Sequence, residues 1–462
     1  MNIPIVAGIY AEHGIRVDYP RNLRPVGIGS GISDYLLQPT PGVEPWGGEL
    51  PGMDRGGINW REACYRVAGT RLVLIEGDGA ITDLGEVRDG GTVTFDYGFD
   101  RLAVCAGGTL YYWDGVALTA VADKDLGAVQ SFVWSDGYYV CTDGINITVT
   151  ELADPTAADP LKYGGAEADP DPVYALHKIR REVYAVNRNT IEVFQNVGGS
   201  LFPFSRIDGA QVQKGSVGIH ASCVWADTIA FVGGGRNEAV SIYSAVNGQA
   251  QRIGTLETDR ILAALSPTQL ADIEVETMAD EIGALLLVHL PDRTLAYDGT
   301  ASQMLGQPIW LDLRSGMLFE PYRARHPVLC YGHWIVSDTE SPQLGRLTNQ
   351  VATHWGDHTA WSFATPILWG GGPSALIHRL ELTALTGDVP LTEIPVAWTA
   401  YSHDGETWSQ DRGTSLGATG YRAHRIAWMQ QGYIRQWRIQ RFRGYAPLSV
   451  LSLDAQMEPL GV

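Results

Sequence analysis

The sequence has few cysteines and no long apolar run, and each shortage excludes a class of protein. The five cysteines are odd in number and lie at least 36 residues apart, so no Cys-x-x-Cys pair for zinc or redox chemistry is present. Free, buried thiols in a reducing compartment are expected instead. The longest apolar runs, such as Gly283–Val288, are too short to span a bilayer. Because the N-terminus also lacks the charged and then apolar order of a signal peptide, we expect a soluble protein made in a cytoplasm, without membrane insertion.

Positive charge is also in short supply. Lysine and arginine number 33 against 52 acidic residues, which gives a net charge of −19, and only four of the basic residues are lysine. A chain of this charge repels nucleic acid at long range, so sequence-specific DNA binding is not expected. Residues 1–365 hold 25 basic and 44 acidic residues, whereas residues 366–462 hold eight of each. This asymmetry indicates two domains with different surroundings.

Glycine and proline are abundant, with 54 and 24 residues. No collagen period explains them, so they indicate many turns between short strands. Eight Asp-Gly dipeptides favour hairpin turns, because both residue types tolerate positive φ. For example, the apolar run 109–113 precedes Asp114-Gly115, and a second apolar run follows it. Such units recur roughly every 40–50 residues between positions 60 and 350, a spacing typical of propeller blades.

Two segments interrupt this pattern. Residues 258–272 are expected to form a short helical insertion, with Ser266 as an N-cap and Pro267 in the first turn. The acidic, proline-rich segment Glu151–Val173 is expected to be a long connector and not a strand. From Leu376 to Met457 the sequence alternates evenly between polar and apolar residues, as in a compact β-sandwich.

The sequence therefore predicts an all-β fold: an irregular β-propeller-like domain with a short helical insertion, followed by a C-terminal β-sandwich. We expect an extended arm and first strands over residues 1–60, the propeller-like domain over 61–360 and the sandwich over 366–462. The boundary is placed near 355–370, where Gly370-Gly371-Gly372-Pro373 breaks the alternation.

No residues form a convincing catalytic, cofactor or metal site. His354 and His358 could share a metal ion on a helix, but Trp355 stands where a zincin needs glutamate, and a solvated loop is favoured. Asp169 and Asp171 could bind calcium, but the alternating prolines favour a linker. The glycine triplets lack the context of a phosphate-binding loop. We therefore predict no enzyme and no cofactor.

One stretch is a candidate contact surface. The segment Tyr421–Arg443 contains no acidic residue, and its arginines alternate with aromatic residues. The functional interpretation is a subunit or partner contact; the alternative is an edge strand whose arginine stems cover aromatic rings. We call these residues the arginine strip: Arg422, Arg425, Arg435, Arg438, Arg441 and Arg443.

Many short segments, in a fixed order, resemble the packaged-DNA stabilisation protein of short-tailed bacteriophages, which is also called the tail hub or nozzle. The resemblance covers nearly the whole chain and is clearest over Asp159–Trp310. The segments that carry it are Asp159–Tyr163, Ala166–Asp171, Thr190–Phe194, Val212–Gly215, Arg260–Leu262, Gln269–Asp272, His289–Pro291, Leu295–Asp298, Pro308–Trp310, Leu380–Leu382 and Ser402–Tyr421.

The resemblance implies a structural protein of the virion tail, made in the host cytoplasm. Such a protein forms a ring, expected to be hexameric, below the portal and its adaptor protein. It closes the tail, retains packaged DNA and contacts the tail needle and tailspikes, while genomic DNA passes on ejection without sequence-specific contact. The alternative is a carbohydrate-binding β-propeller or glycoside hydrolase, because 14 tryptophans and 20 tyrosines could stack on sugars; no pair of acids stands out to support it.

Overall fold

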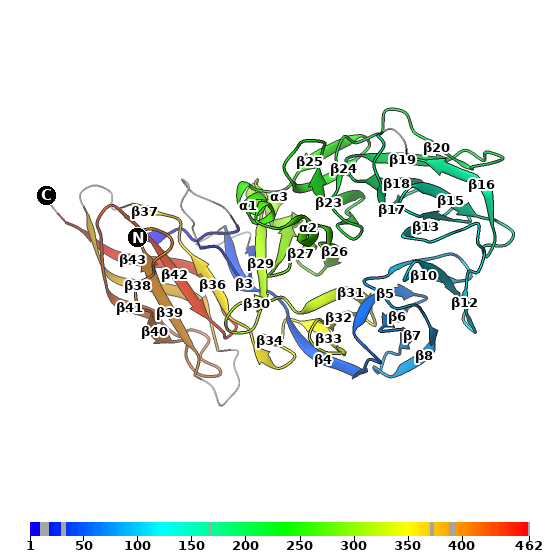
Figure 1. Ribbon diagram of the computed structural model, residues 1–462. Helices are drawn as coiled ribbons and strands as arrows, with labels where there is room; N and C mark the ends of the chain where they lie inside the picture. The colour runs from blue at the N-terminus through cyan, green and yellow to red at the C-terminus, as the bar shows by residue number, and fades with distance from the viewer. Residues whose placement is uncertain (10–17, 29–33, 167–168, 370–373, 388–393, 461–462) are drawn as a thin grey trace.

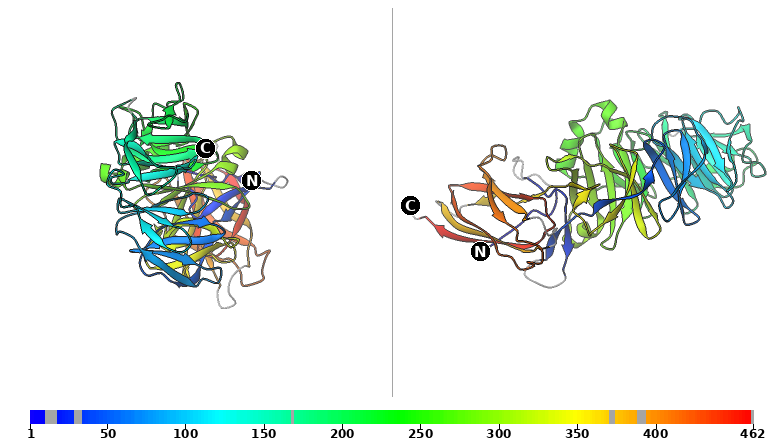
Figure 2. Two further views of the ribbon diagram at one scale, coloured as in Figure 1. Left: turned by 90° about the vertical axis from the view of Figure 1, so that its right-hand side faces the viewer. Right: turned by 90° about the horizontal axis from the view of Figure 1, so that it is seen from below.

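The computed structural model describes residues 1–462 except 10–17, 29–33, 167–168, 370–373, 388–393 and 461–462. Strands hold 54% of the chain and helices 5%, so the predicted all-β class is confirmed. The described residues form nine sheets. Seven of them surround one axis as a β-propeller, and two pack as a β-sandwich beside it (Figure 1). The two parts lie end to end in an elongated molecule (Figure 2).

Each blade begins with a strand near the axis and steps outward; among the described strands the pairs are antiparallel except for one parallel pair in the seventh blade. The first four blades are β5 (Asp54–Trp60), β6 (Ala63–Ala68), β7 (Arg71–Ile75) and β8 (Ile81–Glu86); β9 (Thr94–Tyr97), β10 (Leu102–Ala106), β11 (Thr109–Trp113) and β12 (Leu118–Ala120); β13 (Ser131–Ser135), β14 (Tyr138–Thr142), β15 (Asn146–Thr150) and β16 (Ala158–Gly165); and β17 (Val173–Ile179), β18 (Glu182–Asn187), β19 (Ile191–Asn196) and β20 (Phe204–Arg206).

The fifth blade holds β21 (Gly215–Ser216), β22 (Ser222–Trp225), β23 (Thr228–Gly234), β24 (Ser241–Val246) and β25 (Gln249–Arg252). The sixth holds β26 (Glu274–Ala279), β27 (Ala284–His289), β28 (Thr294–Asp298), β29 (Trp310–Ser315) and β30 (Glu320–Pro321). The seventh holds β31 (Ala324–Cys330), β32 (His333–Asp338), β33 (Gln343–Thr348), β4 (Gly42–Glu49), β34 (Thr353–His354) and β35 (Asp357–His358).

The seventh blade closes the ring with strands from two distant parts of the chain. Strand β4 comes from the N-terminal region and pairs with β33, whose residues lie about 300 positions later (register Leu347↔Val43). The inner strands then contact one another around the whole ring, and β31 of the seventh blade contacts β5 of the first. A closed ring leaves no blade face open at the seam.

The hairpin turns follow the dipeptide signal of the sequence. Between β13 and β14, Asp136 has φ 49° and Gly137 has φ 92°, and Ser135 pairs with Tyr138 across the turn. Both central residues have the positive φ of a type I′ turn. The hairpin predicted at this dipeptide is therefore confirmed.

The predicted helical insertion is present between the fifth and sixth blades. Helix α1 (Leu256–Ala263) is capped by Thr255, and α2 (Pro267–Ala271) starts after Ser266, whose side chain accepts a hydrogen bond from the Gln269 backbone N–H. A third helix, α3 (Gly299–Leu305), was not predicted. Asp298-Gly299 begins this helix instead of forming a hairpin turn, because the Asp298 carboxylate accepts a hydrogen bond from the Ala301 N–H at 2.9 Å.

The prediction that Glu151–Val173 contains no strand is wrong. Strand β16 runs from Ala158 to Gly165 and pairs with β15 at the outer edge of the third blade. Proline is tolerated there because an edge strand needs hydrogen bonds on one side only. The glycine-rich segment Gly370-Gly371-Gly372-Pro373 lies outside the described residues.

The sandwich contains strands from both ends of the chain. One sheet holds β1 (Asn2–Ile3), β2 (Leu23–Gly27), β3 (Tyr35–Pro39), β43 (Ser449–Pro459), β38 (Ala375–Leu385) and β41 (Ile426–Ile434). The other holds β36 (Trp361–Ala364), β37 (Leu368–Trp369), β42 (Trp437–Gly444), β39 (Val396–Ser402) and β40 (Arg412–Ser415). Leu23 and Leu37 of the N-terminal hairpin are buried with Phe363 and Phe442 in the sandwich core, so the chain starts and ends in this domain.

Candidate functional site

The junction of the two domains is built on a short N-terminal segment, residues 18–22. The backbone N–H of Arg21 donates to the carbonyl oxygen of Ser362 in β36 at 2.8 Å, and the N–H of Asn22 donates to the carbonyl oxygen of Asp312 in β29 at 3.1 Å. The segment therefore links a sandwich strand to a strand of the sixth blade.

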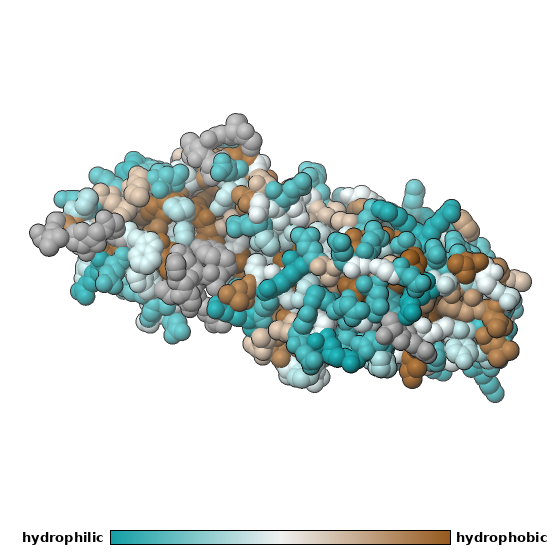
Figure 3. Space-filling view, turned by 90° about the horizontal axis from the view of Figure 1, so that it is seen from above, coloured by the Kyte–Doolittle hydropathy of each residue, from teal (hydrophilic) through white to brown (hydrophobic). Residues whose placement is uncertain are grey.

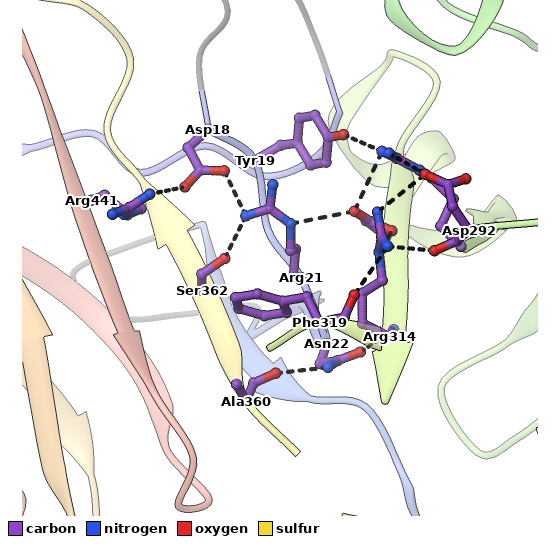
Figure 4. Close-up of polar contacts among 12 residues, drawn as sticks. Asp18, Tyr19, Arg21, Asn22, Asp292, Arg314, Phe319, Ala360, Ser362 and Arg441 are labelled. Atoms are coloured by element: carbon purple, nitrogen blue, oxygen red, sulfur yellow. Dashed lines mark hydrogen bonds and ion pairs between the residues drawn. The ribbon is translucent and has the colours of Figure 1, made fainter. Parts of the chain in front are cut away.

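Side chains of the same segment reinforce this link (Figure 4). The Arg21 guanidinium lies 2.7 Å from Asp18 and donates to the Ser362 hydroxyl at 3.1 Å. The amide nitrogen of Asn22 donates to the carbonyl oxygen of Ala360 at 2.7 Å, and its amide oxygen accepts from the Arg314 N–H at 2.8 Å. Each of these two side chains thus contacts more than one part of the junction.

Three arginines surround one buried carboxylate, that of Asp312, which is 0% exposed. Arg314 Nε lies 2.8 Å from Asp312 Oδ1, while Arg21 Nε and Arg293 Nη1 lie 3.4 Å and 3.8 Å from Oδ2. Burial opposes the charge on Arg21, but Asp18 and Asp312 outweigh it and raise the pKa of Arg21 above its usual value. Arg21 therefore stays charged at the junction.

A pocket of about 370 Å³ opens beside this cluster, between helix α1, the sixth blade and the sandwich. Trp408 and Arg441 line it from the sandwich, and Arg260 lines it from α1. The Arg441 guanidinium lies 4.0 Å from the centre of the Trp408 ring and 3.8 Å from Asp18 Oδ2. The pocket wall is therefore formed largely by groups that already pair with one another.

The fold divides the arginine strip. Arg438 is 0% exposed and donates hydrogen bonds to the Gln431 carbonyl oxygen at 2.8 Å and to Gln440 Oε1 at 2.6 Å. Burial lowers its pKa to about 10. Arg441 and Arg443 are half-buried, and Arg443 pairs with Asp411.

The other three arginines of the strip are exposed. Arg425 pairs with Glu381 of β38 at 2.7 Å, Arg435 donates to the Tyr433 hydroxyl at 3.0 Å, and Arg422 lies in the segment before β41. These three arginines are therefore available to a partner in the folded chain, and the side chain of Arg443 is also 43% exposed.

The seam between the first and seventh blades carries a second buried charge cluster. Arg66 of β6 is 0% exposed and donates to Asp54 of β5 at 2.9 Å and to the carbonyl oxygens of His326 and Ile335 in the seventh blade at 2.9 Å and 2.8 Å. His326 Nδ1 lies 2.7 Å from Asp54 Oδ2. Burial disfavours a charged imidazole, but the hydrogen bond to Asp54 and the nearby carboxylates outweigh it and raise the pKa of His326 to about 9. No pattern in the sequence indicated this cluster, because its members lie in distant segments.

The residues considered for metal binding have protein partners. His354 is buried, with Nδ1 2.8 Å from the Ser315 hydroxyl, and burial lowers its pKa to about 4. Asp169 pairs with Arg236, and Asp171 accepts from the Asn189 N–H. Among the residues that the structure describes, no group of three or more histidine, cysteine or acidic side chains could hold a metal ion.

Most of the aromatic residues considered for sugar stacking are buried or half-buried, although Trp369 and four tyrosines are exposed. Trp60, Trp310, Trp361 and Trp428 are each at most 3% exposed. The large apolar side chains that are exposed include Leu161, Val197 and Leu201 on the third and fourth blades, at the propeller end away from the sandwich, where Figure 3 shows brown residues on a mainly hydrophilic surface. Within the described ranges, no helix is long and apolar enough to cross a membrane.

Two family models together match almost the whole chain. The model described as bacteriophage P22 Gp10, beta-propeller, matches residues 1–352, and the model described as bacteriophage P22 Gp10, beta-sandwich, matches residues 360–458. The tail hub protein gp10 of Salmonella phage P22 is 25% identical over 409 residues, which is 84% of each chain.

Solved structures resemble the fold only distantly. The N-terminal domain of Nup159 is 9% identical with a TM-score of 0.41 and covers 72% of this chain and 99% of its own. PorZ, a surface component of the type-IX secretion system of Porphyromonas gingivalis, is 12% identical with a TM-score of 0.39 and covers 80% of this chain and 46% of its own. The two family models carry the assignment: the chain belongs to the bacteriophage P22 Gp10 family and is a structural tail hub protein of the short-tailed phage type, not an enzyme.

Proposed function

We propose that this tail hub forms a ring of six copies that closes the exit channel of the virion and retains the packaged DNA. In this proposal one face of the ring binds the portal-adaptor protein, and other faces anchor the tail needle and the tailspikes. Genomic DNA passes through the ring on ejection without sequence-specific contact.

The observation that carries the proposal is the junction of the propeller and the sandwich. A ring that resists internal pressure needs subunits whose domains keep a fixed relation. Here residues 18–22 bridge β29 and β36 through backbone hydrogen bonds, and three arginines surround the buried Asp312. Buried ion pairs are costly to break singly, because the remaining charge is left without a partner. The junction therefore favours a subunit that transmits load between its two domains.

The charge distribution supports contacts between unlike surfaces. Residues 1–365 carry the whole net charge of −19, while the exposed Arg422, Arg425 and Arg435 lie in the neutral C-terminal part. In a ring, one patch of a subunit meets a different patch of the next. These arginines would face either an acidic surface of the next subunit or an acidic surface of the adaptor. Such a contact offsets part of the electrostatic repulsion between six acidic copies.

The same charge suits a channel through which DNA slides. An acidic wall does not bind phosphates, because binding relies on lysine and arginine that neutralise the backbone. Retention is then a matter of steric closure by the ring and its needle, and ejection meets no sequence-dependent barrier.

Assembly with the portal–adaptor complex tests the proposal. The full chain is mixed with that complex, and light scattering after size-exclusion chromatography gives the number of copies bound. We expect six copies per complex, and we expect DNA-filled particles without the hub to retain their DNA once the protein is added. A chain that stays monomeric with the complex present, or that binds without reducing DNA loss, contradicts the proposal.

A further inference from the structure

The pocket at the junction of the two domains has an apolar wall that is not fully covered. It has a volume of about 370 Å³ and lies beside residues 18–22. Ile261 of α1 and Leu265, just after this helix, line it from the propeller, and Trp408, which precedes β40, lines it from the sandwich. All three side chains are half-buried and pack against one apolar cluster. Part of each side chain is therefore open to a ligand.

The remaining wall reverses the sign of the charge that the chain carries as a whole. Three acidic residues line the pocket against five arginines, and the buried Asp312 beside them makes four carboxylates. The local excess is thus one positive charge, in a chain whose net charge is −19. Because a concave site lined by charge of one sign attracts ions of the other sign, the pocket favours an anion. The arginines are Arg21, Arg260, Arg293, Arg314 and Arg441.

Arg441 of β42 has weaker hydrogen-bond partners than Arg21 on the same wall. The Arg21 guanidinium donates to Asp18 at 2.7 Å. The Arg441 guanidinium instead stacks on the Trp408 ring, and its Nη1 lies 3.8 Å from Asp18 Oδ2, beyond hydrogen-bonding distance (Figure 4). Its Nε is buried and has no hydrogen-bond partner in the part of the chain that the structure describes. Arg441 therefore lines the pocket with donor capacity that these residues do not use.

The electrostatic surroundings of Arg441 agree with an unmet acceptor. Burial lowers the pKa of Arg441, Asp18 opposes this shift, and the neighbouring Arg443 and Arg21 add to it. Asp18 does not compensate fully, because its other oxygen, Oδ1, already accepts a hydrogen bond from Arg21. A bound anion supplies the negative charge that the buried guanidinium lacks.

We propose that this pocket binds a small organic acid, whose carboxylate accepts hydrogen bonds from Arg441 and whose apolar body covers Trp408 and the α1 side of the pocket. The planar fork of a guanidinium matches the two oxygens of a carboxylate. Arg260, whose side chain is 48% exposed and lies 3.3 Å from Glu257, reaches the same pocket from α1. It adds a second cation for the carboxylate.

The size of the pocket favours an organic acid over an inorganic ion. A dry cavity of about 150 Å³ holds a benzene molecule, and the 370 Å³ available here also accommodates a carboxylate arm. Inorganic phosphate would pair with the arginines but leave the apolar wall uncovered. An organic acid covers this wall as well and gains the free energy of removing apolar surface from water.

Such a ligand would join the two domains. It contacts α1 and the sandwich at once and requires both to be folded, so it raises the free energy of unfolding. Binding does not depend on ring formation. A hub that forms its ring and binds no acid would leave the proposed function intact, and a hub that binds an acid but forms no ring would leave this inference intact.

The experiment uses the folded full chain and three probes: hexanoate, phenylacetate and indole-3-acetate. Calorimetric titration at constant ionic strength measures affinity, and differential scanning calorimetry measures the Tm. We expect at least one probe to raise the Tm and to bind about 10-fold or more tightly than acetate, which has the same charge but little apolar surface. The neutral amide of that probe should bind about 10-fold or more weakly than the acid, because it offers the arginines no charge.

Two neighbouring alanines locate the site. Ala264 is exposed and lines the pocket, whereas Ala263 is exposed and lies outside the pocket wall. Ala264→Glu brings a carboxylate to the pocket and should weaken binding of the probe about 10-fold or more. Ala263→Glu changes the net charge equally and should bind as wild type does. Arg441→Gln, which removes the charge, should also weaken binding; if this variant does not fold, the two alanine variants still decide the question.

Four results would each overturn the proposal. In the first, none of the three acids binds more tightly than acetate at millimolar concentration. In the second, the amide binds as tightly as its acid, so that charge is not recognised. In the third, inorganic phosphate binds as tightly as the best acid, which shows a simple anion site. In the fourth, Ala264→Glu binds the probe as tightly as wild type, which places the ligand elsewhere.

Discussion

The guanidinium of Arg21 lies 3.4 Å from the buried carboxylate of Asp312, and this ion pair joins the N-terminal segment to the sixth blade of the propeller. Arg293 and Arg314 contact the same carboxylate, so one negative charge holds three positive ones at the junction (Figure 4). The link between the sandwich and the propeller therefore depends strongly on one buried side chain, that of Asp312.

We expect Asp312→Asn to destabilise the chain severely. The substitution leaves three arginines beside a neutral amide in a buried place, and removing one partner of a buried ion pair costs about 3–5 kcal/mol. Urea denaturation followed by circular dichroism measures the change. Asp292→Asn is the matched control, because Asp292 also pairs with Arg293 and Arg314 but its carboxylate is 55% exposed; it should cost about 0–1 kcal/mol. Equal effects of the two substitutions would contradict the importance assigned to the buried carboxylate.

The exposed arginines of the strip are expected to act in assembly and not in folding. Arg422→Glu with Arg435→Glu should leave the free energy of unfolding within about 0.5 kcal/mol of wild type, since both side chains lie on the surface. Lost attraction and new repulsion should weaken ring formation or docking by about 2- to 30-fold at low salt, with less effect as salt rises. Light scattering against protein and salt concentration measures this.

The control for that pair reverses two exposed arginines of the propeller, Arg88→Glu with Arg181→Glu, which changes the net charge equally. If both double variants assemble equally poorly, net charge and not the strip is responsible. Arg438 is excluded from the test because it is buried: a glutamate there would unfold the sandwich and so confuse assembly with stability.

The domain boundary near 355–370 remains a prediction, which limited proteolysis can test. Strands β1, β2 and β3 complete the sheet of β43 and β38, so residues 366–462 alone lack part of their core. We expect limited proteolysis in this region to leave the two pieces associated in native buffer and to release a fragment of roughly 10 kDa only under denaturing conditions. Release of a folded C-terminal fragment in native buffer would contradict this expectation.

Local signals in the sequence predicted local structure well. Asp136-Gly137 forms its hairpin because both residues accept positive φ, and Ser266 followed by Pro267 starts α2 as expected. The same reasoning failed where an Asp-Gly dipeptide can either form a hairpin turn or begin a helix. Asp298-Gly299 has the dipeptide of a turn, but the carboxylate caps α3 instead.

Contacts between distant segments could not be predicted. The burial of Arg438, the three arginines around Asp312 and the pairing of β4 with β33 all depend on how the sheets pack. The spacing of the cysteines did not indicate that Cys64 of the first blade and Cys330 of the seventh lie in one buried cluster. A charged residue in a strand is exposed or buried according to its neighbour in space, and the sequence alone does not name that neighbour.

The stability of the seam between the first and seventh blades should depend on pH through His326. The imidazole of His326 lies beside several charged or titratable groups: Asp54 on β5, Glu274 and Glu276 on β26, His220 before β22, and Arg325, the preceding residue of β31. Its pKa in the folded chain is raised to about 9, above the usual value near 6.5. The folded state therefore binds a proton that the unfolded state releases.

Because the folded state holds this proton more tightly, protonated His326 stabilises the folded chain. Its contribution to the free energy of unfolding is fully present below about pH 6.5 and is lost as the pH rises through 9, with a slope of at most about 1.4 kcal/mol per pH unit. Cys64 on the same seam acts in the opposite direction, because its lowered pKa favours the folded state as the pH rises. The comparison is therefore made in a Cys64→Ser background. Between pH 6.5 and 9, the free energy of unfolding should fall more steeply with His326 than with His326→Gln, which cannot titrate. Parallel curves for the two proteins would contradict a raised pKa of His326 in the folded chain.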